Sequence, residues 1–204
     1  DHGEGADFFS VGKSLGAGSS GIVWNGKLIQ SGLFTHHRII ANGPIRISFE
    51  LYYPNIKLDT AKYLLVKRIT LDAGEQLNKI EEQYISNSSI ETLTVASGLV
   101  KRPNTEMKRS PDNRWMSLWG LTNADSGNGY LGTAVLFPYS TTVSAREDSI
   151  QYYLLSATGR KNSFTYFSGA AWTRMGDFSY EKEWIQYLDT FVTRVHHPLI
   201  ISFQ

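Results

Sequence analysis

Residues 38–53 read RIIANGPIRISFELYY, and this stretch decides the fold class. Asn42-Gly43-Pro44 in its middle is a turn signal. From Ile45 onward apolar and polar residues alternate, which is the period of a half-buried β-strand. The apolar side of this strand is expected to join a core, and the polar side is left for solvent or a ligand.

The polar side of this strand carries a row of functional groups. Arg46, Ser48, Glu50 and Tyr52 occupy every second position, about 7 Å apart along a strand. An Arg guanidinium can form a bidentate hydrogen bond with a carboxylate, and a Tyr hydroxyl can donate a hydrogen bond, so the row suits an anionic sugar. An ordinary solvent-facing strand is the alternative, because such faces are common on antiparallel sheets.

The rest of the chain continues the pattern of short strands and turns. Asn25-Gly26 predicts a hairpin within 21–29. One helix is predicted over 179–195, capped by Ser179. Strands without regular strand–helix alternation indicate an all-β fold, an antiparallel two-sheet β-sandwich of the galactose-mutarotase-like or supersandwich kind, with one late α-helix. Further strands are expected at 63–71, 77–85, 90–95, 115–121, 130–137, 150–158, 163–172 and 199–203.

Composition limits the function classes. The 204 residues fit a single domain, 1–204, and the absence of cysteine excludes disulfides, thiolate nucleophiles and Cys-rich zinc sites. A net charge of +1 leaves no electrostatic footprint for nucleic acid. No apolar run approaches the roughly 20 residues that span a bilayer. The start has no signal-peptide pattern, so the chain is expected to be a processed product or the later part of a longer protein.

Histidines provide candidate proton-transfer groups. His2 and Glu4 lie two residues apart in the Gly-rich start and would share one side of an extended segment, as an acid–base pair or half of a metal site. A flexible terminus is the alternative. His36 and His37 precede the polar strand, and neighbours on a strand face opposite sides, so at most one points into any cleft.

Five motifs, taken in order along the chain, resemble one bacterial family of domains of unknown function. Its members sit among polysaccharide-degrading enzymes, are often exported, and usually carry more sequence before the first motif. The resemblance covers almost the whole chain. The motifs are HGEGADFFSVGKSLGAG (2–18), NGPIRISFELYY (42–53), LDAGEQLNKIE (71–81), GYLGTAVLFP (129–138) and SGAAWTRMGDFSYEKEW (168–184).

This resemblance implies work on uronic-acid oligosaccharides, as in ulvan or pectin breakdown, in the periplasm or outside the cell. One member type is similar to an oligosaccharide dehydratase, a carbon–oxygen lyase that removes water from a terminal uronic acid and leaves a 4,5-unsaturated sugar. The implied partner is a uronic-acid oligosaccharide. An upstream segment of the same protein or a second copy of the chain is a further expected partner.

Such an elimination needs three groups. A cation must neutralise the carboxylate, a base must remove the proton at C5, and an acid must protonate the oxygen that leaves C4. From this chemical need, the candidates are Arg46 with Arg38 as the clamp, His2 or His37 as the base, and Tyr52 or Tyr84 as the acid.

Further residues are expected to hold the sugar. Glu4 or Glu50 would orient a His or contact sugar hydroxyls, and aromatic rings would stack on the sugar. No metal or cofactor is required, although the Asp/Asn alternation of 122–129 raises calcium as an alternative; this loop lacks the terminal Glu of an EF-hand. The stacking candidates are Trp119, Tyr130 and Trp172.

Two rival functions fit the same sequence. A glycoside hydrolase needs two carboxylates about 5–10 Å apart, for which Glu50 with Glu4 or Asp125 are candidates. A non-catalytic carbohydrate-binding module fits the 13% aromatic content and the sandwich. Product analysis separates all three, because only elimination creates a conjugated double bond.

Overall fold

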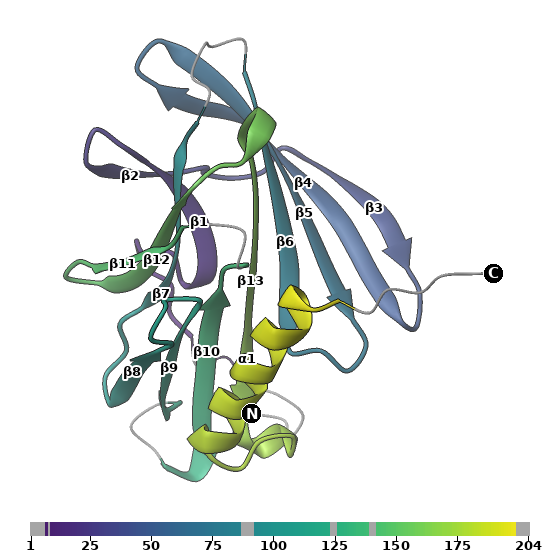
Figure 1. Ribbon diagram of the computed structural model, residues 1–204, viewed down its shortest axis with the longest axis vertical. Helices are drawn as coiled ribbons and strands as arrows, with labels where there is room; N and C mark the ends of the chain where they lie inside the picture. The colour runs from purple at the N-terminus through teal and green to yellow at the C-terminus, as the bar shows by residue number, and fades with distance from the viewer. Residues whose placement is uncertain (1–6, 8, 87–91, 123–125, 139–141, 199–204) are drawn as a thin grey trace.

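The computed structural model describes residues 7, 9–86, 92–122, 126–138 and 142–198, and these form two antiparallel sheets and one α-helix (Figure 1). The predicted all-β sandwich with a late helix is confirmed. The strands are β1 (Ala17–Trp24), β2 (Lys27–Gln30), β3 (His36–Asn42), β4 (Arg46–Leu58), β5 (Ala61–Asp72), β6 (Leu77–Ile85), β7 (Thr94–Val100), β8 (Thr105–Arg109), β9 (Trp115–Leu121), β10 (Tyr130–Leu136), β11 (Ser144–Glu147), β12 (Gln151–Ala157) and β13 (Ser163–Trp172), and the helix is α1 (Glu181–His196).

The two sheets differ in size. The larger sheet has eight strands in the order β3-β4-β5-β6-β13-β10-β9-β8, and the smaller has five in the order β11-β12-β7-β1-β2. The β3–β4 hairpin turns at 43–45, as the Asn-Gly-Pro signal predicts. Asn25 and Gly26 join β1 to β2 with positive φ values of 49° and 74°, which a tight hairpin turn requires.

Two short strands were not predicted from the sequence. β8 (TEMKR) and β11 (SARE) lie at the edges of their sheets and are not among the predicted strands, because they have no apolar alternation. β7 begins at Thr94, later than the predicted 90–95 strand, and residues 87–91 lie outside the described part of the chain. The strand expected at 199–203 also lies outside it.

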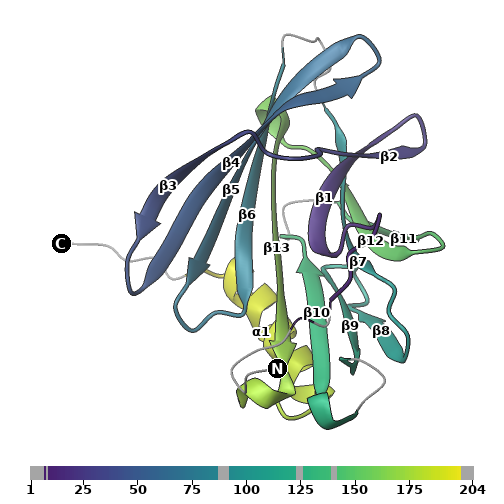
Figure 2. The same cartoon turned by 180° about the vertical axis from the view of Figure 1, so that it is seen from behind.

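The main core lies between the sheets. Side chains from the inner face of the larger sheet, the face that looks toward the smaller sheet, meet those of β1, β7 and β12. Fully buried members include Ile22, Tyr63, Leu99, Met116 and Tyr166. The five-stranded sheet is narrower than the eight-stranded sheet, so β3, β4 and β5 extend beyond it (Figures 1 and 2).

α1 packs on the opposite face of the larger sheet, which is called the outer face below. Trp184, fully buried, donates its indole N–H to Ser117 Oγ on β9 at 2.9 Å, and Leu188, Phe191 and Val192 complete the buried stripe. The helix covers β9, β10 and β13 and leaves the outer face of β3–β5 open. No helix among the described residues is long and apolar enough to cross a bilayer.

The start of α1 differs from the prediction. The helix begins at Glu181 with Tyr180 as its N-cap, so Ser179 does not cap it. Instead the carboxylate of Glu183 accepts hydrogen bonds from the backbone N–H groups of Ser179 at 2.6 Å and Tyr180 at 3.3 Å. An acidic side chain in the first turn thus supplies the acceptor that a capping Ser would have supplied.

Candidate functional site

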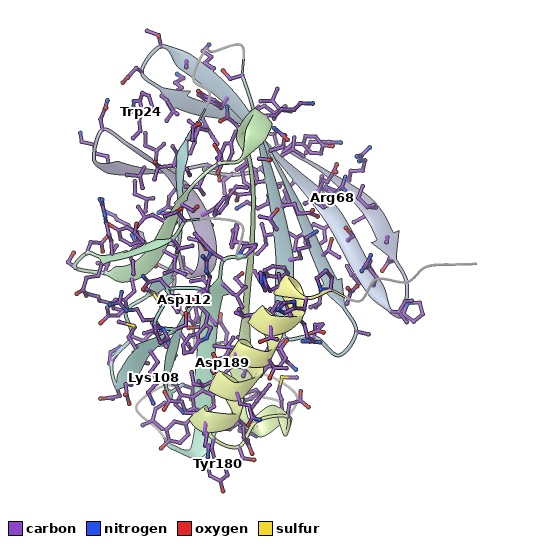
Figure 3. The ribbon with its side chains drawn as sticks, viewed as in Figure 1. Trp24, Arg68, Lys108, Asp112, Tyr180 and Asp189 are labelled. Atoms are coloured by element: carbon purple, nitrogen blue, oxygen red, sulfur yellow. The ribbon has the colours of Figure 1, made fainter. Side chains whose placement is uncertain are left out.

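The open outer face carries the polar row predicted on β4. Three of its four members face polar side chains of β5, because the strands pair in antiparallel register, and the fourth, Tyr52, faces Val66. Ser48 Oγ lies 2.8 Å from Thr70 Oγ1, and Arg68 lies on the strands that α1 leaves uncovered (Figure 3). The register pairs Arg46 with Asp72, Ser48 with Thr70, and Glu50 with Arg68.

Glu50 is the centre of the strongest interaction on this face. Arg38 donates to Glu50 Oε2 from Nε at 3.1 Å and Nη2 at 2.8 Å, and Arg68 donates to Oε1 from Nε at 3.1 Å and Nη2 at 2.7 Å. Tyr52 donates its hydroxyl to Oε2 at 2.7 Å. We call Arg38, Glu50, Tyr52 and Arg68 the Glu50 cluster.

Burial and charge set the protonation states in the Glu50 cluster. Burial alone would raise the pKa of Glu50, but hydrogen bonds from Arg68, Tyr52 and Arg38 outweigh it and hold this pKa below its ordinary value. Donation to Glu50 raises the pKa of Tyr52. At neutral pH the carboxylate is therefore ionised and the phenol keeps its proton.

The Glu50 cluster keeps an excess of positive charge. Two guanidiniums share one carboxylate, so one positive charge is left over. The Glu50 side chain is 5% exposed, whereas those of Arg38 and Arg68 are 58% and 46% exposed. The excess charge therefore faces solvent on guanidiniums whose orientation is already fixed, which suits an incoming carboxylate.

Arg46, the predicted clamp, is already matched in charge. Its Nε and Nη2 donate to the two carboxylate oxygens of Asp72 at 2.5 and 2.7 Å. This hydrogen bonding lowers the pKa of Asp72 and raises that of Arg46. Lys79 is likewise paired with Glu81 at 2.8 Å. These exposed pairs leave the excess charge on the Glu50 cluster.

Two hollows flank the Glu50 cluster. The first, of about 450 Å³, lies between β3–β6 and α1, and the second, of about 340 Å³, lies on the other side of Arg68. Arg68 and Glu81 line both hollows, so the two hollows meet at these side chains, and together they are called the groove below. The first hollow combines an apolar wall of Leu77, Phe167 and Phe191 with polar side chains of β4, β5 and β6.

An ion pair holds α1 beside the first hollow. Glu75, in the turn between β5 and β6, accepts from Arg194 Nη1 at 2.7 Å and Nη2 at 2.9 Å, and from the Tyr187 hydroxyl at 2.9 Å. Glu75 also lines the hollow. The distance between the helix and the turn therefore affects the width of the groove.

The structure places His36, rather than the proposed His37, on the side of the Glu50 cluster. His36 pairs with Tyr52 and His37 pairs with Leu51, so His37 faces away from the row. The rings of His36 and Tyr52 have centroids 5.3 Å apart. Because side chains alternate along a strand, the choice between His36 and His37 follows once the β3–β4 register is known. The other proposed base, His2, and the proposed Glu4 lie outside the described residues.

Tyr84 does not join the site. It is buried on the inner face, where its hydroxyl donates to Glu82 Oε2 at 2.7 Å. Glu82 Oε1 also accepts from Ser20 Oγ and lies 3.0 Å from the buried Lys67 ammonium. Burial and the neighbouring Glu82 raise the pKa of Tyr84 well above its ordinary value. The whole sheet separates this phenol from Arg46, so Tyr84 has a packing role.

The three aromatic candidates are not brought to the groove. Trp119 stacks on Tyr130, with centroids 6.2 Å apart and planes 10° apart, but Trp119 is 8% exposed and belongs to the core under α1. Trp172 follows Ala171 of that same core along β13, so it faces the other side of the sheet, where its indole N–H donates to the Asn128 carbonyl at 2.8 Å. Trp119 and Trp172 are therefore not sugar platforms of this groove.

The proposed calcium loop and one rival carboxylate cannot be placed. Residues 123–125 of the 122–129 loop, including Asp125, lie outside the described residues. Within the described ranges, no group of three or more His, Asp and Glu side chains is positioned to hold a metal ion.

The β5 and β6 residues that line the groove are not among the site residues predicted from the sequence. Arg68, Thr70 and Asp72 alternate with apolar residues in β5, as Lys79 and Glu81 do in β6. The same period-two pattern that revealed the β4 row was therefore present there. Only the strand register could align the three rows.

Comparisons with known proteins place the chain among domains without an assigned activity. The family described as "Domain of unknown function (DUF4861)" matches residues 1–201. "Uncharacterized protein P7" of Formosa agariphila is 30% identical over 215 residues, a match that covers 100% of this chain and 51% of the relative. The chain thus spans about half the length of that relative.

Proposed function

The chain belongs to the DUF4861 family of domains of unknown function, and from this premise we propose that it is a carbohydrate-active carbon–oxygen lyase. Its proposed reaction is β-elimination at the terminal uronic acid of ulvan- or pectin-type oligosaccharides, which gives a 4,5-unsaturated uronyl product. The proposed location is the periplasm or the cell exterior. The observation that carries the proposal is the positively charged Glu50 cluster at the middle of an open groove.

The groove supports binding of an acidic oligosaccharide. Arg38 and Arg68 are half exposed and oriented by Glu50, so a sugar carboxylate would meet guanidiniums that need little reordering. Hollows of about 450 and 340 Å³ on either side fall within the usual range for small-ligand sites. Arg46, matched by Asp72, is assigned to sugar hydroxyls rather than to the carboxylate.

The proposed step uses His36 as the base and Tyr52 as the acid. The imidazole takes the proton from C5, the electron pair of that C–H bond forms the C4=C5 double bond, and the C4–O bond breaks. The leaving oxygen receives the phenol proton of Tyr52. Arg38 and Arg68 stabilise the negative charge that builds on the carboxylate. If the oxygen on C4 leaves as water, the reaction is a dehydration. If that oxygen leaves as part of another sugar, the reaction cleaves the chain.

The first test follows absorbance of the conjugated product in the near ultraviolet, with ulvan and pectin oligosaccharides as substrates, followed by mass analysis. A rise in absorbance with loss of one water supports the dehydratase, and a rise with shorter chains supports a polysaccharide lyase. Shorter products without absorbance indicate a hydrolase, which the lowered pKa of Glu50 disfavours because a general acid must hold a proton.

Adjacent histidines supply a matched pair of variants. His36→Ala is expected to lower the rate by about 10²–10⁴, the usual worth of a proton-transfer group, whereas His37→Ala should retain it. Both side chains are exposed, so neither change should unfold the protein. Loss of activity in His37→Ala alone would place the chemistry on the other face of the sheet.

A non-catalytic carbohydrate-binding module is the second candidate. Arg46 pairs with Asp72 and Lys79 pairs with Glu81, so these exposed charged side chains already have partners. This pairing favours the binding module, because binding alone needs no side chain that gains or loses a proton. Calorimetric binding of the intact oligosaccharide, with a flat absorbance trace and unchanged glycan mass, would select this function.

A further inference from the structure

The two hollows of the groove lie at different points along the strands. Val66, which pairs with Tyr52, lines the second hollow. Arg46 and Asp72, which pair with each other, line the first hollow. Arg46 and Tyr52 are about 20 Å apart along β4, at about 3.3 Å per residue. His36 pairs with Tyr52, so the two groups assigned to proton transfer lie at the end of the groove that the second hollow forms.

This order assigns one sugar to each hollow, on the premise of the proposed elimination. The reacting uronic acid must contact His36 and Tyr52 and place its carboxylate on Arg68, so it lies over the second hollow. Arg68 and Glu81 line both hollows, and from them the groove continues toward Arg46. The first hollow, of about 450 Å³, therefore receives the sugar that is joined to the reacting one.

The cations that line the first hollow already have partners. Arg46 donates to both carboxylate oxygens of Asp72, and the ammonium of Lys79 lies 2.8 Å from a carboxylate oxygen of Glu81. Arg68 also lines this hollow, but it is assigned to the carboxylate of the reacting sugar. Among the described residues, the lining thus offers no unmatched cation to a second acid group.

A carboxylate on the neighbouring sugar would instead meet negative charge. Asp72, Glu75 and Glu81 all line the first hollow. Like charges repel one another at distances up to about 10 Å at 0.1 M salt, and the hollow is small enough for all three carboxylates to act on one occupant. The lining therefore opposes a second carboxylate, whereas sugar hydroxyls can still hydrogen-bond to its polar side chains.

The apolar part of the first hollow adds to this preference. Leu77, Phe167 and Phe191 form one wall, and the rings of Phe167 and Phe191 pack edge to face with centroids 5.1 Å apart. Ile40, 44% exposed, lines the hollow from β3. A methyl or hydroxymethyl group on C5 of a sugar can lie against such a wall at little cost. A carboxylate in that position would lose hydration without gaining a partner.

We propose that the first hollow is the subsite for the sugar next to the reacting uronic acid, and that it selects a sugar without a carboxylate. Asp72 is a specificity-determining residue, because it neutralises Arg46, which would otherwise bind a second acid group. The preferred oligosaccharides alternate uronic acids with sugars that lack a carboxylate, and consecutive uronic acids are disfavoured. This inference rests on the proposed function and narrows its substrate class.

The test compares the binding of two trisaccharides by calorimetry. Both begin with a terminal uronic acid. In one the second sugar is also a uronic acid, and in the other the carboxylate of that second sugar is reduced to a hydroxymethyl group. Every protein carries His36→Ala so that the ligands are not consumed, and mass analysis after each titration checks this. We expect the reduced ligand to bind about fivefold more tightly, the upper range for interactions between exposed charges.

Two variants should remove the preference by different routes. Asp72→Asn frees Arg46, and Ile40→Lys adds a cation at an exposed site. Each should strengthen binding of the consecutive uronic acids about fivefold and leave binding of the reduced ligand within about twofold. Glu147→Gln is the matched control, because Glu147 forms an exposed ion pair with Lys101 and lies on β11 of the smaller sheet. This control should change neither affinity.

Arg68→Ala separates this inference from the proposed function. It should weaken both ligands, because both present the terminal carboxylate to Arg68. Equal affinity for the two ligands, with both weakened by Arg68→Ala, would overturn the inference and leave the proposed site standing. Tighter binding of the consecutive uronic acids, or a preference that Asp72→Asn and Ile40→Lys leave unchanged, would also overturn the inference. Binding of neither ligand would overturn it together with the proposed function.

Discussion

Replacing Glu50 by Gln tests the Glu50 cluster most directly. The substitution keeps the shape of the side chain and removes its charge. A carboxylate offers both oxygens as acceptors, one to Arg38 and one to Arg68. A Gln amide has one oxygen and one NH₂ group, so one of the two guanidiniums faces a donor whichever way the amide turns.

The magnitude follows from how far the groups are exposed. Hydrogen bonds to charged groups are worth about 1.5–3 kcal/mol when their partners are buried. Glu50 is buried, but about half of each guanidinium side chain is exposed, so water replaces part of the lost interaction. We expect a loss of about 1–2 kcal/mol in the free energy of unfolding. For a domain of this size that corresponds to roughly 3–6 °C in Tm.

The pH dependence gives this prediction its signature. The folded-state pKa of Glu50 lies below its ordinary value of 4.5, so its stabilisation is present above that value and is lost as pH falls through the folded pKa. The stability difference between the wild type and Glu50→Gln should therefore be full at pH 7. It should shrink once the pH falls below about 4.

Urea unfolding followed by tryptophan fluorescence at pH 7, 5 and 3.5 measures the difference. Glu81→Gln is the matched control, because Glu81 lies on the same face but is 39% exposed and pairs with Lys79. A Glu50→Gln loss below about 0.3 kcal/mol at pH 7, or one that stays undiminished at pH 3.5, would refute the reasoning.

Further changes test the interior. Lys67→Met should cost about 3–5 kcal/mol in urea unfolding, because it leaves the Glu82 carboxylate buried without its cation; adding Glu82→Leu should recover part of the loss. Burial opposes ionisation of Lys67, yet Glu82 raises its pKa, so this stabilisation is full below the unfolded pKa of about 10.4 and is lost only as pH rises toward the higher folded value; a urea series from pH 7 to about pH 10 should therefore show the Lys67→Met loss unchanged. Gly169→Ala should cost about 3 kcal/mol by thermal unfolding, because its Cβ would lie 1.9 Å from the backbone oxygen of Gln76. Gly43→Ala, with its nearest atom at 3.9 Å, should be nearly neutral.

Local patterns predicted the strands well where turns bound them. The strands at 77–85, 115–121 and 163–172 coincide with β6, β9 and β13, because each is an apolar or alternating run flanked by polar turns. β8 and β11 carry no such run, since both are short edge strands, and their pairing comes from neighbours distant in sequence.

The position of α1 could not be predicted from its own residues. The spacing of Trp184, Leu188 and Phe191 indicates an apolar stripe, but it does not say which sheet face the stripe covers. That placement buries Trp119 under the helix and leaves β3–β5 open. The prediction that Trp119 stacks on a sugar did not take this burial under the helix into account.

The candidate site was predictable along one strand and not across strands. Arg46, Glu50 and Tyr52 share a face because alternation within β4 determines it. The choice between His36 and His37, and the role of Arg68, depend on register between strands. Long-range pairing of that kind leaves no local trace in the sequence.

The attachment of α1 through Glu75 has a consequence for how such a domain can diversify. The Arg194–Glu75 ion pair lies at the surface, outside the buried stripe that holds the helix on the sheet. Replacing this exposed pair would alter the space beside Phe191 while the sandwich core stays as it is. Acceptance of larger or smaller ligands could thus evolve by single surface substitutions, without compensating changes in the interior.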